Sequence, residues 1–210
     1  MAETRYVEAI NRALHEEMER DESVILVGLD GGRQGGLFGA SRGLLDRFGR
    51  DRVIDTPISE AGYTGAAIGM AMEGLRPVVE IQFADFVTVA FDQLTTVAAK
   101  MHYLTGGAVS VPLVVRLPYG VNITGGYMTG AGPHHSQSPE AWLCHCAGLK
   151  VVMPSNPADA LGLLKASIRD NNPVIFMEQK GLYWASSEDL AGGDLTVPLG
   201  VGAIPRGGDD

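Results

Sequence analysis

Short, continuously apolar runs alternate with longer amphipathic segments along most of the chain. The apolar runs predict strands at residues 24–29, 52–55, 77–81, 111–117, 150–153 and 174–178. The segments between them predict helices at residues 5–20, 40–48, 60–73, 85–103, 139–146 and 157–170. Uniformly apolar strands separated by helices are typical of a parallel sheet buried on both faces. The expected fold is therefore an α/β three-layer sandwich, with a mostly parallel sheet of roughly six strands covered by helices on both faces.

The last part of the chain does not follow this alternation. Residues 181–210 are rich in glycine and proline, and they predict no helix and one short strand at residues 197–204. We expect a single domain at residues 1–185. We expect residues 186–210 to be a linker leading to a C-terminal domain that is absent from this chain.

Charge and cysteine content narrow the function classes. The net charge of −9 argues against a nucleic-acid backbone or an anionic membrane as the main partner. The N-terminal segment is amphipathic and acidic, without the apolar stretch of a signal peptide, and no apolar run is long enough to span a bilayer. The only cysteines, Cys144 and Cys146, are poorly spaced for a disulfide or a metal site on one helix. Their number suits a reducing compartment, so we expect a cytoplasmic location.

A single carboxylate stands out in the segment from Asp55 to Gly74. Glu60 follows a potential N-cap at Ser59 and opens a helix of small and apolar residues that carries no further charge before Glu73. Such a helix should be buried on most faces, with Glu60 at the edge of the buried region. Burial raises the pKa of a carboxyl group and a helix N-terminus lowers it. If burial dominates, Glu60 can give or take one proton near neutral pH; the alternative is that it only caps its own helix.

Further candidates follow the next two predicted strands. Ligands bind open parallel sheets at the carboxyl ends of the strands. Gln82, Phe83, Asp85 and Phe86 follow the third strand, and the ring of Phe86 could stack on a planar ligand. His134 and His135 lie in a glycine-rich loop after the fourth strand, where histidine could transfer protons. The alternative is a loop histidine bonded to the backbone. Neither a dinucleotide fingerprint nor a Walker lysine motif is present.

Four segments resemble one known family, the beta subunits of thiamine-diphosphate-dependent 2-oxo acid dehydrogenases. They are DRVIDTPISEAGYTGAAIGMAMEGLRPVVEIQFADF, AFDQ, HHSQSPEAW and HCAGLKVVMPSNPADA. The family comprises E1 components that act on pyruvate, branched-chain 2-oxo acids or acetoin, and the more distant transketolases share its pyrimidine-binding module. The resemblance runs from about residue 4 to the end of the chain. It implies the thiamine-diphosphate-binding fold, with this chain as the pyrimidine module.

The resemblance implies a role for each candidate residue. Glu60 matches the glutamate that hydrogen-bonds N1′ of the cofactor's aminopyrimidine and so promotes loss of the thiazolium C2 proton. Phe86 matches an aromatic position, usually tyrosine, that packs on the pyrimidine, and Gln82 matches a pocket position. His135 matches the histidine at the site entrance, near the transferred acyl group and the lipoyl arm. His134 falls where the family often has an aromatic or another residue.

The resemblance also bears on metal ions. In several members a potassium ion supports the histidine loop, and the matching residues here are Val111, Leu113, Ser167, Asp170 and Asn172. The family marks its magnesium site with a GDG motif followed by an asparagine, and no GDG occurs in this sequence. We therefore expect no Mg²⁺ site in this chain, with the metal and the diphosphate held mainly by a partner chain.

The function implied is that of an E1 beta-type subunit, inactive without an alpha partner. The assembly would be an α2β2 heterotetramer that oxidatively decarboxylates a 2-oxo acid and passes the acyl group to the lipoyl domain of an E2 acyltransferase. Two alternatives stay open. One is a split transketolase-like subunit transferring ketol units between sugars, which a phosphate-binding arginine cluster including Arg116 would favour. The other is a non-catalytic assembly module. The loop at residues 118–133 is longer than in many members and could reshape access to the site.

Overall fold

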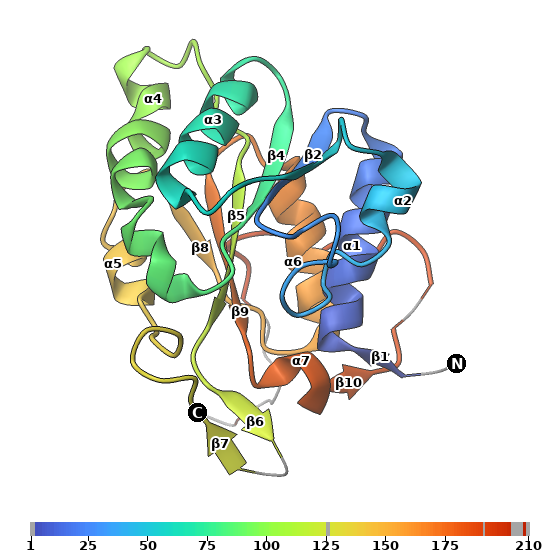
Figure 1. The fold of residues 1–210 in the computed structure, drawn as a ribbon. Helices are drawn as coiled ribbons and strands as arrows, with labels where there is room; N and C mark the ends of the chain where they lie inside the picture. Colours follow the sequence, from blue (N-terminus) through green and yellow to red (C-terminus); the bar gives the residue numbers. More distant parts are fainter. Residues whose placement is uncertain (1–2, 125–126, 191, 203–207, 209–210) are drawn as a thin grey trace.

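A six-stranded parallel sheet forms the centre of the chain (Figure 1). The structure is a computed structural model that describes residues 3–124, 127–190, 192–202 and 208. The strands lie in the order β3-β2-β4-β5-β9-β8, and every neighbouring pair is parallel. Their bounds are β2 Val24–Gly28, β3 Val53–Asp55, β4 Arg76–Glu80, β5 Val114–Tyr119, β8 Lys150–Val152 and β9 Val174–Gln179. The α/β class and the sheet of about six strands are confirmed.

Successive residues of each strand face opposite sides of the sheet and enter two separate hydrophobic clusters. One cluster includes Val114 and Val174, and the other includes their neighbours Val115 and Ile175. The first is covered by α1 (Tyr6–Arg20), α2 (Leu44–Phe48) and α6 (Pro157–Arg169), and the second by α3 (Glu60–Met72), α4 (Ala99–Leu104) and α5 (Glu140–Cys144) (Figure 1). Helices therefore cover both faces, as expected. Among the described residues, none of the helices is long and apolar enough to cross a membrane.

The single long helix predicted at residues 85–103 is divided in the structure. A 3₁₀ helix, η1, spans Ala84–Thr88, and a separate helix then contains a π-helical stretch, η2 (Gln93–Ala98), before α4. The Thr95 hydroxyl donates a hydrogen bond of 2.8 Å to the Phe91 carbonyl within this stretch. Such bonding back to the preceding turn competes with the helical ladder and bends helices. The hydrophobic pattern did not reveal this change, because the buried positions keep nearly helical spacing.

Helix α3 is buried on one face only, which corrects the prediction that it is buried on most faces. Its buried residues are Tyr63, Thr64, Ala67, Ile68 and Ala71. Gly62, Ala66 and Gly69 lie exposed on the opposite face. The small residues that made the whole helix look buried therefore form a bare surface in this chain.

The segment after β9 is more ordered than its composition suggested. Residues Leu182–Ala185 form a short helix, α7, so the prediction of no helix beyond residue 181 is wrong. The ring of Tyr183 is buried, with its centroid 6.0 Å from that of Tyr6 and 5.0 Å from that of Phe38. This tertiary anchoring, rather than local propensity, explains the helix. Strand β10 (Ser187–Glu188) then pairs antiparallel with β1 (Thr4–Arg5).

The remaining differences concern loops and strand ends. Strand β5 begins three residues later than predicted, after Pro112, which has no N–H to donate to a sheet. The loop at residues 118–133 contains an antiparallel hairpin of β6 (Asn122–Thr124) and β7 (Tyr127–Thr129). The predicted strand at 197–204 is not formed over residues 197–202, and residues 203–204 lie outside the described part.

A buried cluster of charges joins the three central strands at their carboxyl ends. Arg116 on β5 donates from Nε and a terminal nitrogen to the two oxygens of Glu178 on β9, at 2.6 and 2.9 Å. Its other terminal nitrogen donates to Glu80 on β4 at 2.6 Å. All three side chains are at most 2% exposed. Tyr183 completes the cluster by donating its hydroxyl to Glu178 at 2.5 Å.

The glycine-rich loop after β2 folds over this cluster. The backbone N–H of Leu37 donates to the Glu80 carboxylate. Gly36 approaches so closely that a Cβ atom there would lie 2.5 Å from Glu80 Oε1, and its φ of +74° favours glycine. The ion cluster therefore fixes the loop as well as the strands.

Replacing Arg116 with methionine should destabilise the fold by about 3–5 kcal/mol, because two carboxylates would be left buried without their cation. Urea unfolding measures this loss. The deficit should shrink as the pH falls. Burial already raises the pKa of Glu80 in the intact cluster, loss of the Arg116 charge should raise it further, and protonation of the variant's buried carboxyl groups then stabilises its folded state toward acid. Arg47→Met is the matched control. Arg47 pairs with Glu19 on the surface, both side chains more than half exposed, and its loss should cost less than ~0.5 kcal/mol. Equal effects of the two substitutions would refute this account.

Replacing Gly36 with alanine should destabilise the fold through two separable effects. A left-handed backbone costs an L-residue roughly 1–2 kcal/mol, and the clash with Glu80 should add ~1–3 kcal/mol. Gly49→Ala isolates the first effect, since Gly49 has φ +77° and no atom within 4 Å of an added Cβ. Similar unfolding free energies for the two variants would show that the contact with Glu80 is not tight.

Candidate functional site

The predicted site residues follow strands β3, β4 and β5, whose carboxyl ends share one edge of the sheet. Glu60 follows β3 and opens α3, Gln82 and Phe86 follow β4, and His135 follows β5 and its hairpin. Because all these strands are parallel, the loops after them gather on the same side of the molecule. This edge is also where the Arg116 cluster lies, so the candidate site rests on a rigid base.

Phe86 and His135 are brought together in an aromatic cluster. The centroids of these two rings are 5.4 Å apart, with an interplanar angle of 86°. Phe83 contacts both, at 4.5 Å from His135 and 6.0 Å from Phe86, again edge to face. Phe38, from the glycine-rich loop, adds a further edge-to-face contact with Phe83 at 5.9 Å. The rings fix one another's orientation through the favoured T-shaped geometry. His134, in contrast, is exposed.

Two charged residues lie beneath the histidine loop. Lys180, directly after β9, is 1% exposed, donates a hydrogen bond to the backbone carbonyl of His135, and places Nζ 4.9 Å from the centroid of the Phe83 ring. Asp85 is 6% exposed, and its Oδ1 accepts hydrogen bonds from the backbone N–H and the side-chain amide of Gln137, at 3.3 and 3.0 Å. The sequence analysis placed Asp85 among the candidates after the third strand but gave it no role, and it missed Lys180. A lysine directly after an apolar strand was the available signal.

Glu60 is half-buried as the first residue of α3. Within the described chain its carboxylate makes no hydrogen bond and no ion pair, so the alternative that it caps its own helix is not observed. Ser59 occupies the N-cap position but makes no side-chain cap bond. Burial, followed by the charge of Glu60, raises the pKa of Tyr63 one turn further along the helix. Gln82 donates its amide to the Leu29 carbonyl at 3.4 Å.

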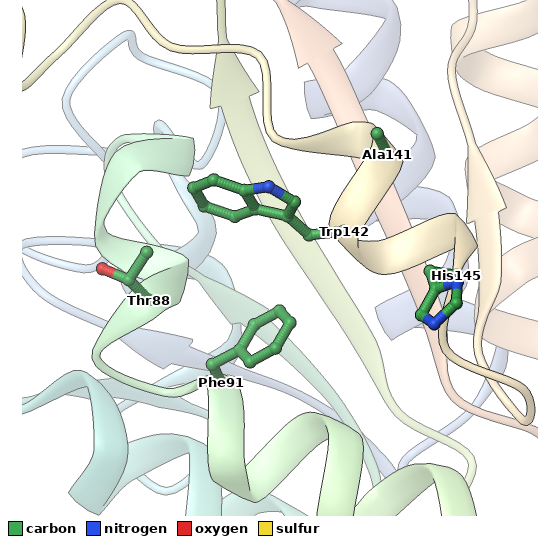
Figure 2. Close-up of a pocket in the computed structure, with 5 residues that line it drawn as sticks. All are labelled: Thr88, Phe91, Ala141, Trp142 and His145. Atoms are coloured by element: carbon green, nitrogen blue, oxygen red, sulfur yellow. The ribbon is translucent and has the colours of Figure 1, made fainter.

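An apolar hollow lies to one side of this cluster, between η1 and α5 (Figure 2). It has a volume of about 600 Å³ and is lined by Thr88, Phe91, Ala141, Trp142 and His145. Figure 2 shows the indole of Trp142 extending from α5 toward Thr88, with the ring of Phe91 facing the same space. None of the predicted site residues lines the hollow, and the sequence pattern did not predict it.

The residues proposed for potassium binding gather around the end of α6, but their oxygens are engaged. Asp170 Oδ1 accepts from the backbone and side chain of Asn172, at 2.8 and 2.9 Å, and Oδ2 pairs with Lys150 at 2.5 Å. Its backbone carbonyl accepts from Arg76 at 3.1 Å. The Ser167 hydroxyl donates within its own helix, and the Leu113 carbonyl accepts from Val174 N. The potassium site stays a prediction and enters no step proposed below.

Other candidate groups are accounted for by the structure. Arg116 is wholly engaged by two glutamates, so it is not available to a phosphate group. Cys144 and Cys146 are free thiols. Within the described residues, no cluster of three histidine, cysteine or acidic side chains could hold a metal ion.

Residues 2–185 match the family described as the transketolase pyrimidine binding domain. The 2-oxoisovalerate dehydrogenase subunit beta of Bacillus subtilis (strain 168) is 46% identical over 210 residues, which cover 100% of this chain and 62% of the relative. The mitochondrial pyruvate dehydrogenase E1 component subunit beta of Homo sapiens is 44% identical over 204 residues, covering 96% of this chain and 55% of the relative. The chain thus spans little more than half the length of such relatives.

One solved structure supports the fold independently of close sequence similarity. A chain titled "Split gene transketolase, inactive beta4 tetramer" superimposes with a TM-score of 0.71 at 16% identity, covering 100% of this chain and 61% of that chain. At this identity the likeness shows the fold alone. The resemblance inferred from the four sequence segments is confirmed by the relatives, and the chain belongs to the transketolase pyrimidine-binding domain family.

Proposed function

We propose that this chain is the beta-type subunit of a 2-oxo acid dehydrogenase E1 component and contributes the aminopyrimidine half of a thiamine diphosphate site. The assembled enzyme oxidatively decarboxylates a 2-oxo acid and passes the acyl group to a lipoyl group. Similarity to beta subunits named for pyruvate and 2-oxoisovalerate dehydrogenases supports the reaction class. The observation that carries the proposal in this chain is the unpartnered carboxylate of Glu60.

Glu60 differs from an ordinary first-turn glutamate. It begins a helix that packs on the sheet, it is half-buried, and no described side chain or amide satisfies it. A carboxyl group without a hydrogen-bond partner at the start of this helix could bind a ligand that offers a hydrogen-bonding group. A ring nitrogen of an aminopyrimidine is such a group, because it accepts a proton from a carboxylic acid. In this role the carboxyl group of Glu60 would share one proton with the ring nitrogen.

The aromatic cluster suits a planar ring beside Glu60. An aromatic side chain held edge to face by its neighbours can pack on a heteroaromatic ligand with little loss of entropy. In this proposal Phe86 packs on the pyrimidine, Gln82 lines its pocket, and His135 stands at the entrance. Bound thiamine diphosphate supplies the carbon nucleophile that attacks the 2-oxo group. Glu60 would hold the proton at N1′, and His135 would stand near the transferred acyl group, where an imidazole can donate or accept a proton.

The proposal includes an alpha-type partner, because this chain carries half a site. The partner holds Mg²⁺ and the diphosphate and completes an α2β2 heterotetramer, and the lipoyl domain of an E2 acyltransferase receives the acyl group. Large apolar side chains lie exposed near the site: Ile58 is 77% exposed, Val89 54% and Trp142 48%. Surface of this kind, beside a bare helix face and an apolar hollow, is typical of protein interfaces.

The free thiols of both cysteines agree with a cytoplasmic location.

Cofactor binding should require both chains. Calorimetry with thiamine diphosphate and Mg²⁺ should give no measurable heat of binding with this chain alone. It should give a dissociation constant in roughly the micromolar range once the alpha-type subunit is added. Tight binding, or 2-oxo acid turnover, by the isolated chain would contradict the division of the site.

Replacing Glu60 with glutamine in the assembled enzyme should lower kcat by at least ~10²-fold, because an amide cannot hold the proton at N1′. The melting temperature should stay within about 2 °C of the original, since Glu60 bonds to none of the residues that the structure describes. Glu73→Gln is the matched control. Glu73 is the exposed C-cap residue of the same helix, and its loss should leave turnover unchanged within about twofold. Full activity of the Glu60→Gln enzyme would remove the mechanistic claim.

A further inference from the structure

The loop that carries His135 is anchored by contacts with two buried charged residues, Lys180 and Asp85. Most of residues 129–138 are exposed. Within the loop, Ala131 N donates to the Ser136 hydroxyl at 2.8 Å and His135 N to the Gly132 carbonyl at 3.4 Å. One link to the sheet is a hydrogen bond of 3.0 Å from Gly120 N to the Gln137 carbonyl. Lys180 and Asp85 provide further anchors. The loop could shift as a body if these two contacts were lost.

Lys180 is an unusual anchor, because a lysine is almost never fully buried without a paired charge. Among the described residues it forms no salt bridge. Its ammonium group has the His135 carbonyl as its hydrogen-bond acceptor and the face of the Phe83 ring as a second contact. Burial lowers the pKa of Lys180 more than the Asp85 charge raises it, so keeping the cation here costs free energy. A methionine could fill the same space without that cost.

Asp85 is held in a similarly costly state. One oxygen accepts both hydrogen bonds from Gln137, while Oδ2 is buried and has no hydrogen-bond partner among the described residues. Burying an apolar residue here would cost less free energy, because it would leave no polar atom without a hydrogen bond. Two buried charges, from η1 and from the end of β9, thus converge on residues 135 and 137 of one exposed loop.

We propose that Lys180 and Asp85 are positioning residues that fix the His135 loop for acyl transfer. The inference rests on the function proposed above and adds two residues to it. Lys180 pins the peptide carbonyl of His135, and Asp85 pins the backbone and side chain of Gln137 two residues later. With both ends of this short segment fixed, the imidazole stays against Phe83 and Phe86 at the observed 4.5 and 5.4 Å. Neither residue needs to touch the substrate.

Kinetics of the assembled enzyme test the role of Lys180. Lys180→Met should lower kcat by about tenfold or more, with KM for the 2-oxo acid changed less than about twofold, because misplacing a reacting group chiefly affects turnover. Lys180→Arg, which keeps a cationic donor, should recover part of the loss. The melting temperature of Lys180→Met should not fall, since a buried cation is removed. A purely structural lysine would instead lower the melting temperature with kcat little changed.

Lys100→Met is the matched control. Lys100 also donates to a backbone carbonyl, that of Ala147, but near α5 rather than beneath the histidine loop. Its replacement should leave kcat within about twofold of the original enzyme. An equal loss in both lysine variants would overturn the assignment.

Amide hydrogen exchange on the same assemblies tests the loop without any turnover. Peptides covering residues 130–138 should exchange about tenfold faster in Lys180→Met and in Asp85→Ala than in the original protein. Asp85→Asn keeps the acceptor for Gln137 and should restore slow exchange. Unchanged exchange in both Lys180→Met and Asp85→Ala would refute the positioning role. Absence of 2-oxo acid turnover in the unmodified assembly would instead contradict the proposed function, and the exchange result would still decide what holds the loop.

Discussion

The contact on which the carboxyl edge of the sheet depends is that of Arg116 with Glu80 and Glu178. A buried ion cluster is a poor source of net stability, because desolvation of the charges offsets most of their attraction. Its contribution here is to fix the relative positions of the strands. The guanidinium binds one carboxylate with two parallel hydrogen bonds and the other with one, so three strands can align in one register only. Two further contacts extend this order: Leu37 N–H donates to Glu80 from the glycine-rich loop, and the Tyr183 hydroxyl donates to Glu178 from α7.

The candidate site lies one step further along the same strands. Two residues beyond Glu80 comes Gln82, and two residues beyond Glu178 comes Lys180. Because side chains alternate along extended backbone, each pair lies on the same side of its strand. Backbone pairing continues into this step, since Ile81 N donates to Arg116 O and Lys180 N donates to Tyr119 O. Gln82 and Lys180 therefore continue the side-chain alternation that places Glu80 and Glu178 in the ion cluster. A one-residue shift in strand register would turn both sets of side chains away from the site.

The sequence predicted what depends on local pattern and missed what depends on strand order. Apolar runs located all six parallel strands. The tendency of ligands to bind at the carboxyl ends of parallel strands predicted that Phe86 and His135 lie close together, as they do. Nothing in the sequence says that β5 lies between β4 and β9, so Arg116 could be weighed only as weak support for a phosphate-binding arginine cluster. Lys180 was missed for the same reason. Helix α7 was missed because the buried ring of Tyr183, and not its glycine-rich surroundings, determines it.

Three glutamates near one edge of the sheet differ in whether they take part in the fold or stay available to a ligand. Glu80 and Glu178 are the more deeply buried pair, and both are committed to Arg116. Glu60 is less buried and has no partner in the described chain. Depth of burial alone would select the wrong residues, because a deeply buried carboxylate must be neutralised by the fold to be tolerated. A group that serves a ligand can instead be one that is only half-buried and bonds to no described residue, and Glu60 is such a group.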